Sequence, residues 1–168
     1  MEIFKSNKEK KVTYLVFGIY LIFLCWLVLF KCAISIEDIP HFRGVNLIPF
    51  YYNNENSVHL KEVVYNIVVF IPAGFYFTAL FGKDKKLTGV FITAILSLLF
   101  EITQWIFSIG ASDITDLITN TLGGICGLFL FILMGKISCS RRMGIANLIG
   151  IVIELLGGGI LVLLLIAN

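Results

Sequence analysis

Charged residues are scarce in this chain: they make up 14% of its 168 residues, whereas hydrophobic residues make up 58%. The mean hydropathy is +0.95. Soluble domains contain about 25% charged residues, so this composition excludes a soluble domain and indicates an integral membrane protein. The formal net charge is only +2. It gives no evidence for nucleic-acid binding, because the basic residues are arranged as membrane topology requires.

Cysteine and histidine are also rare, with four and two residues respectively. The cysteines are Cys25, Cys32, Cys126 and Cys139. Their spacing matches neither a metal site nor a disulfide framework, and His41 and His59 lack the partner spacing of metal ligands. The sequence also has no Ser-His or Cys-His arrangement suited to nucleophilic catalysis. We therefore expect no metal ion and no cofactor.

Five apolar windows of about 20 residues are long enough to cross a bilayer. They are residues 12–30, 63–81, 87–107, 114–134 and 148–166. This pattern predicts an all-α polytopic bundle that forms a single membrane domain, residues 1–168. The first window resembles a signal sequence, but its apolar core is too long and no small-residue cleavage site follows it, so we expect an uncleaved signal anchor.

The basic residues predict how the spans are oriented. With a cytoplasmic amino terminus, ten of the thirteen lysines and arginines fall in cytoplasmic segments, in agreement with the positive-inside rule. Five spans then place the carboxyl terminus, Asn168, outside. The long outer segment contains residues 41–52, which are apolar and aromatic but interrupted by Pro49. This composition predicts an amphipathic or re-entrant outer loop at the level of the lipid headgroups.

Polar residues converge on the outer ends of the spans. At about 1.5 Å per residue, Glu101 lies about 9 Å below the outer end of the third span, and Asn120 lies at a similar depth in the fourth. The polar residues that approach this face are Arg43, Asn46, Asn66, Glu101, Gln104, Asp113, Asp116 and Asn120. An acid inside a membrane costs about 2.5 to 3.5 kcal/mol on insertion scales, so these positions are candidates for a functional site.

The spacing of these residues predicts that they face neighbouring helices. A stripe with a repeat of three and four residues on the fourth span consists of Asp113, Asp116, Asn120, Gly123 and Gly127. The matching stripe on the third span consists of Thr93, Ser97, Glu101, Gln104 and Ser108. The two glycines allow helices to approach closely. We predict that the two stripes enclose one buried cavity or polar network in the outer leaflet.

Structural roles account for part of this pattern. Asp113 and Asp116 stand where a carboxylate caps the start of a helix. Capping does not explain Glu101 or Asn120, for which the structural alternative is an inter-helix hydrogen bond worth about 0.6 to 2 kcal/mol. Arg43 is the expected counter-charge of the acids.

Four segments resemble, in order and spacing, the successive motifs of the VanZ-like family of bacterial membrane proteins. They are residues 43–50 (RGVNLIPF), 66–74 (NIVVFIPAG), 101–104 (EITQ) and 113–123 (DITDLITNTLG). The resemblance covers about residues 40–134. Many members carry an arginine shortly before the aspartate motif, whereas residues 109–112 contain none here. The resemblance implies a multi-pass protein of the bacterial cytoplasmic membrane that contributes to resistance against teicoplanin-type lipoglycopeptides.

Three mechanisms fit the predicted site. The preferred one is a binding protein, in which all eight polar residues surround a membrane lipid, a lipid-linked cell-wall intermediate or the acyl tail of the drug. The second is a membrane-embedded enzyme acting on a lipid-linked or phosphate-bearing substrate, with Glu101 or Asp116 as general base and Arg43 stabilising an anion. The third is a small transporter, although five spans without an inverted repeat match transporters poorly.

Overall fold

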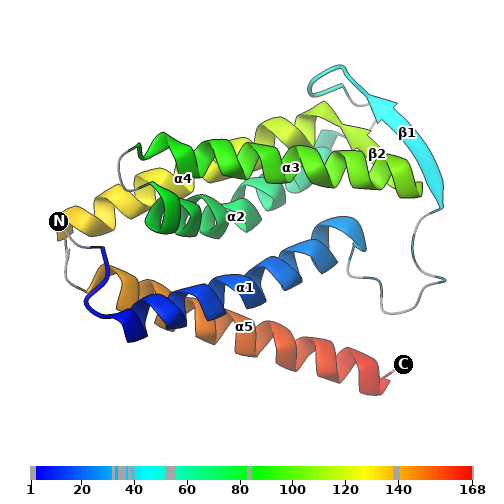
Figure 1. Ribbon diagram of the computed structural model, residues 1–168. Helices are drawn as coiled ribbons and strands as arrows, with labels where there is room; N and C mark the ends of the chain where they lie inside the picture. Colours follow the sequence, from blue (N-terminus) through cyan, green and yellow to red (C-terminus); the bar gives the residue numbers. More distant parts are fainter. Residues whose placement is uncertain are drawn as a thin grey trace. The chain divides into compact units, whose positions relative to one another are not determined.

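The computed structural model describes residues 3–31, 33, 37, 39, 41–51, 56–82, 85–137 and 141–167. Three residues named above, Cys32, Cys139 and Asn168, lie outside these ranges. The helices are α1 (Asn7–Leu29), α2 (Asn56–Phe81), α3 (Leu87–Phe107), α4 (Ile114–Ile137) and α5 (Arg142–Ala167) (Figure 1).

Five helices of the described chain are long and apolar enough to cross a membrane, which confirms the predicted helical membrane bundle. The third predicted span coincides with α3, and the others differ from the helices mainly because turns at the helix ends are less apolar than the cores. For example, α2 begins at Asn56, seven residues before the predicted span. The orientation across the membrane stays a prediction.

Two short strands accompany the helices, β1 (Phe42–Asn46) and β2 (Ile109–Asp113). They pair in parallel, with Phe42 opposite Ile109 and Asn46 opposite Asp113. Parallel strands need a crossover connection, and the consecutive helices α2 and α3 supply it. Figure 1 shows the cyan β1 beside β2, at the end of the bundle where α3 leads into β2. Residues 41–52 were predicted to form an outer loop, and neither strand was predicted from the sequence, because no local pattern reveals hydrogen bonding between segments so far apart in the chain.

The chain divides into two compact units, and one of them, Ile39–Ile132, contains β1, α2, α3, β2 and most of α4. Glycines bring α4 close to α2 in this unit. A Cβ atom added at Gly123 or Gly127 would collide with the backbone carbonyl oxygen of Ile67 or Ile71, respectively. The close helix approach predicted from these two glycines is therefore confirmed.

Aromatic side chains fill the space between the helices of this unit. Phe70 of α2 and Phe100 of α3 make an edge contact with ring centroids 6.3 Å apart. Phe75 of α2 makes a similar contact with Phe131 of α4 at 5.5 Å. These pairs add to the free energy gained by burying the rings themselves, by about 0.5 to 1.5 kcal/mol each.

The other unit consists of Met1–Asp38 and Leu133–Asn168, and α1 packs against α5 within it. The side chain of Ser6 caps α1 by accepting a hydrogen bond from the Glu9 amide at 3.2 Å. Deeper in the pair, Asn147 of α5 donates to the Thr13 hydroxyl of α1 at 2.9 Å. Both residues are buried, so this bond joins the two helices inside their contact.

Candidate functional site

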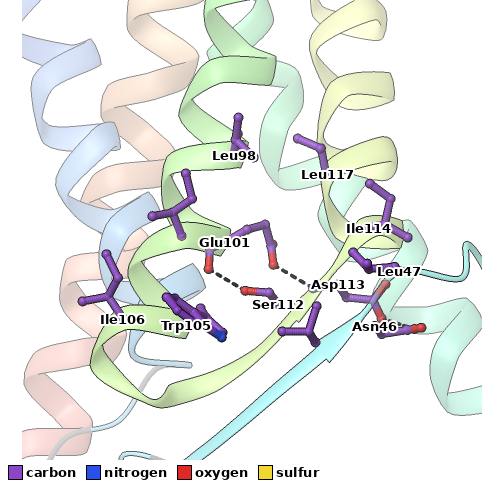
Figure 2. A pocket seen from close by; sticks show the side chains of 12 residues that line it. Asn46, Leu47, Leu98, Glu101, Trp105, Ile106, Ser112, Asp113, Ile114 and Leu117 are labelled. Carbon is purple, nitrogen blue, oxygen red and sulfur yellow. Dashed lines mark hydrogen bonds between the residues drawn. The ribbon is translucent and has the colours of Figure 1, made fainter.

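A groove of about 380 Å³ lies between the strand pair, α3 and the start of α4 (Figure 2). Its polar lining residues are Asn46, Glu101, Ser112 and Asp113. The apolar ones on α3 are Leu98, Ile102, Trp105 and Ile106, and the others are Val45, Leu47, Ile114 and Leu117. This volume falls within the range of small-molecule sites, about 300 to 1,000 Å³.

A reversal of the chain after α3 places the polar groups of the groove. Ser108 ends α3 in a left-handed conformation with φ 57°, and its amide donates to the Gln104 carbonyl oxygen. Strand β2 then returns past the last turns of α3, as Figure 2 shows for Ser112 and Asp113 beside Glu101. The Ser112 hydroxyl donates to the Glu101 backbone carbonyl at 2.6 Å, and the Asp113 amide donates to Glu101 Oε2 at 2.8 Å. The carboxylate of Glu101 thus fixes the end of β2, and this residue is only 6% exposed.

The carboxylate of Asp113, at the end of β2, makes hydrogen bonds to β1 and to the start of α4. Its Oδ1 accepts a hydrogen bond from the Thr115 amide at 2.7 Å, which caps α4 and confirms the capping role expected from the sequence. Its Oδ2 accepts from Asn46 Nδ2 at 3.0 Å, which connects the ends of the two strands. Asn46 Oδ1 in turn accepts from the Ile48 amide at 3.1 Å. The polar side of the groove is therefore held in place from β1, β2, α3 and α4.

The twelve described lining residues of the groove include two acids and no basic residue, but almost all of the groove's surface is apolar. Glu101 and Asp113 are its two ionisable groups. Within the described part of the chain, no three His, Cys, Asp or Glu residues come together as metal ligands do. The groove therefore offers mainly apolar contact, and its two carboxyl groups are engaged in hydrogen bonds within the protein.

Arg43 has different partners from those predicted. Its Nη2 donates to the Ile106 carbonyl oxygen at 3.2 Å, and its guanidinium lies 5.1 Å from the centroid of the Trp105 ring. Among the described residues, these contacts hold it at the carboxyl-terminal end of α3 instead of beside a carboxylate. A cation is favourable there because the last helical carbonyls carry partial negative charge. Arg43 is thus not the counter-charge of the acids.

The remaining predicted residues bond between the helices and do not line the groove. Asn66 of α2 donates to Asp116 Oδ1 of α4 at 2.7 Å. Asn120 of α4 is 2% exposed and donates to the Ser97 hydroxyl of α3 at 2.9 Å. Gln104 is also buried on α3, at 4% exposure. The two polar stripes therefore meet through an inter-helix hydrogen bond, which is the polar network that was one of the two predicted arrangements. Two members of the stripes, Glu101 and Asp113, also line the groove.

Several residues in or beside the groove were missed from the sequence. Ser112 lines the groove and acts through a single hydroxyl group. Thr115 does not line it, but its Oγ1 accepts a hydrogen bond from the Phe50 amide at 3.0 Å. Trp105, Leu98 and Leu117 supply apolar walls and resemble any other residue of an apolar span. The one available signal was the position of Leu98 and Trp105, three residues before and four residues after Glu101, which places all three near one face of α3.

Comparisons with known proteins agree with the resemblance noted in the sequence. Protein VanZ of Enterococcus faecium is 42% identical to this chain over 121 residues, which cover 71% of the chain and 73% of that protein. The model of the VanZ/LLP1 family matches residues 17–135, which include the strand pair, α2, α3 and nearly all of α4. No solved structure matches the chain. The chain belongs to the VanZ/LLP1 family.

Proposed function

We propose that the groove binds a membrane lipid or a lipid-linked cell-wall component, and that this binding contributes to resistance against teicoplanin-type lipoglycopeptides. The observation that carries the proposal is the groove itself, about 380 Å³ in volume, whose surface is almost entirely apolar. Such a surface suits the acyl chain of a lipid, and the hydrogen-bonded carboxyl groups of Glu101 and Asp113 lie at one side of it.

The exposure of the lining residues supports a ligand that arrives from the membrane. Leu98, Ile102 and Trp105 line the groove from α3 and are each about 45% exposed. Exposed apolar side chains on a membrane-spanning helix contact lipid chains, so the groove opens toward the acyl region of the bilayer. A ligand dissolved in the membrane therefore reaches it without crossing water.

The depth of the groove supports binding close to the headgroup region. Glu101 precedes the end of α3 by six residues, which corresponds to about 9 Å along the helix axis. Trp105 lies between this level and the helix end, where tryptophan is enriched in membrane proteins. Under the predicted orientation, this end of the bundle faces outward in the cytoplasmic membrane, where a lipoglycopeptide meets the cell.

The link to resistance rests on the family. The relative in Enterococcus faecium is named Protein VanZ, and the VanZ-like resemblance implies low-level resistance to teicoplanin-type compounds. A lipid held at the outer surface could cause this resistance in a physical way, because it changes the lipid into which the acyl tail of the drug inserts or competes with that tail for the same site.

A blocking substitution tests the proposal. Leu98 and Leu99 are adjacent on α3 and are 46% and 52% exposed, but only Leu98 lines the groove. Leu98→Trp should fill the groove, whereas Leu99→Trp adds the same side chain beside it and serves as the matched control. Native mass spectrometry of the purified proteins measures retained lipid, and the teicoplanin inhibitory concentration in a susceptible host measures resistance.

We expect Leu98→Trp to lower both lipid retention and resistance, and Leu99→Trp to change neither. Equal lipid retention and equal resistance in the two variants would show that the groove takes no part in the function. Conversion of the retained lipid into a new chemical species would replace the binding mechanism with the enzymatic one.

A further inference from the structure

We infer that the lipid bound in the groove carries a phosphate group, which the exposed guanidinium of Arg43 binds at the rim while an acyl chain lies in the groove. This inference rests on the proposed binding of lipid in the groove and names the chemical class of the headgroup. It follows from the position of Arg43, from the contacts that its side chain makes and from the apolar surface of the groove.

Arg43 lies directly beside the groove without lining it. Its Nη2 donates to the Ile106 carbonyl oxygen at 3.2 Å, and its guanidinium lies 5.1 Å from the centroid of the Trp105 ring. Both of these partners line the groove, as do Val45 and Asn46, which follow Arg43 in β1. Arg43 is exposed, so its guanidinium is accessible to a ligand at the edge of the groove.

The described contacts of Arg43 leave its charge and most of its hydrogen-bond donors to a ligand. Both partners, a backbone carbonyl and an aromatic ring, are neutral groups, and Arg43 forms no ion pair within the described part of the chain. A guanidinium has five N–H donors, of which one makes the described hydrogen bond to Ile106. The carboxyl-terminal end of a helix carries only about half a negative charge, so it does not neutralise the arginine.

Phosphate is the headgroup anion that complements such a side chain. Its oxygens accept two parallel hydrogen bonds from the guanidinium fork, and these bonds are stronger than bonds between neutral groups because both partners are charged. An arginine that is already held in place by a carbonyl and an aromatic ring loses less conformational entropy when it binds.

The level of Arg43 along α3 suits a headgroup. Ile106 lies one residue before the end of α3, whereas Leu98 lines the opposite end of the same wall, eight residues earlier. At about 1.5 Å per residue, this wall extends about 12 Å from the level at which Arg43 is held. An acyl chain along the wall therefore places the attached phosphate at the end of the helix, where Trp105 is also typical of the membrane interface.

The acids of the groove do not oppose a phosphate at this place. Glu101 accepts a hydrogen bond from the Asp113 amide, and Asp113 accepts from the side chain of Asn46. Almost all of the groove's surface is apolar, so the carboxylate oxygens form little of the surface that the chain contacts. Glu101 also precedes Ile106 by five residues, about 7.5 Å along the axis of α3. Repulsion between a phosphate at the rim and this carboxylate is weakened by the water and salt of the headgroup region.

The test compares two lipids with identical acyl chains, phosphatidylglycerol and diacylglycerol, of which only the first contains a phosphate. Delipidated protein in detergent receives both in equimolar amounts, and native mass spectrometry gives the ratio of the two bound lipids. We expect about a tenfold preference for phosphatidylglycerol, because diacylglycerol offers no charged acceptor to Arg43. Arg43→Gln should bring the ratio close to one. Binding of diacylglycerol offered alone should stay close to that of the unchanged protein, which shows that the variant is folded.

Lys61→Gln is the matched control. Lys61 is an exposed cation on α2 that the predicted topology places on the same side of the membrane, and it does not line the groove. Its substitution removes the same charge from the protein, so the preference should remain. Loss of the preference in Lys61→Gln as well would indicate a general attraction of anionic lipid to a basic surface and would contradict the inference.

Glycerol phosphate, which has the phosphate but no acyl chain, distinguishes a lipid from a soluble phosphate ester. An excess of it should leave the bound phosphatidylglycerol in place, because the groove holds the chain. Displacement of the lipid would make Arg43 a site for soluble phosphate esters, against the inference.

A ratio close to one in the unchanged protein, or an unaltered preference in Arg43→Gln, would overturn the inference. If Leu98→Trp still lowers the binding of both lipids relative to Leu99→Trp in that case, lipid binding in the groove stands and only the assignment of the phosphate fails. If Leu98→Trp has no such effect, the proposed function fails as well.

Discussion

Replacement of Glu101 separates its structural role from its role in binding. The carboxylate accepts the Asp113 amide at 2.8 Å in a site that is 6% exposed. Glutamine keeps an oxygen for this bond but no charge, so a bond worth about 1.5 to 3 kcal/mol becomes one worth about 0.5 to 1.5 kcal/mol. We therefore expect Glu101→Gln to lower the free energy of unfolding by about 1 kcal/mol.

Glu101→Ala should cost more, because it removes the acceptor and leaves the part-buried Asp113 amide without this bond. The lost bond and the new space together correspond to about 2 to 4 kcal/mol. Unfolding by steric trapping in bicelles measures both variants, with immunoblots of membranes as a check on protein level. Function should respond more strongly than stability. Glu101→Gln should abolish teicoplanin resistance although the protein remains folded and abundant.

Two results would refute this reasoning. Equal destabilisation by glutamine and alanine would show that the charge itself holds β2 in place, and loss of resistance would then report folding. Full resistance in a folded Glu101→Gln variant would show that resistance does not depend on the Glu101 carboxylate.

Three further predictions concern the packing of the helices and the topology. A double-mutant cycle of Asn66→Ala and Asp116→Ala should give a coupling energy of about 0.6 to 2 kcal/mol in bicelles, and purely additive losses would show that their 2.7 Å hydrogen bond contributes nothing to stability. Arg43→Ala should cost about 1 kcal/mol and add to the loss in Glu101→Ala, because the two side chains have separate partners; a coupling well above about 0.5 kcal/mol would instead pair them. In a cysteine-free background, single cysteines at Tyr51 and Lys85 should react with impermeant reagents from opposite sides of the membrane, and reaction of both from one side would contradict the predicted topology.

The polar stripes show how far helical periodicity reaches. Ser97 and Glu101 on α3, and Asn120 on α4, were placed on contact faces by their spacing, and all three are buried. Periodicity gives the direction of a side chain from its own helix axis, but not the partner it meets. The two stripes were predicted to enclose a cavity or a polar network. The amides of Asn120 and Asn66 bond to Ser97 and Asp116, so a network forms between the helices, and the groove lies beside Glu101 and Asp113.

Composition, span length and motif order are local properties of the chain, so the class of the protein, its five apolar helices and its family could be predicted without a structure. The groove could be found only in the folded chain. It depends on the pairing of β1 with β2, whose residues are 67 positions apart in register, Asn46 opposite Asp113. It also depends on the placement of Arg43 against Ile106 and Trp105. Such contacts form between segments that are distant in sequence, so their geometry follows from the packing of the whole unit and leaves no pattern in either segment alone.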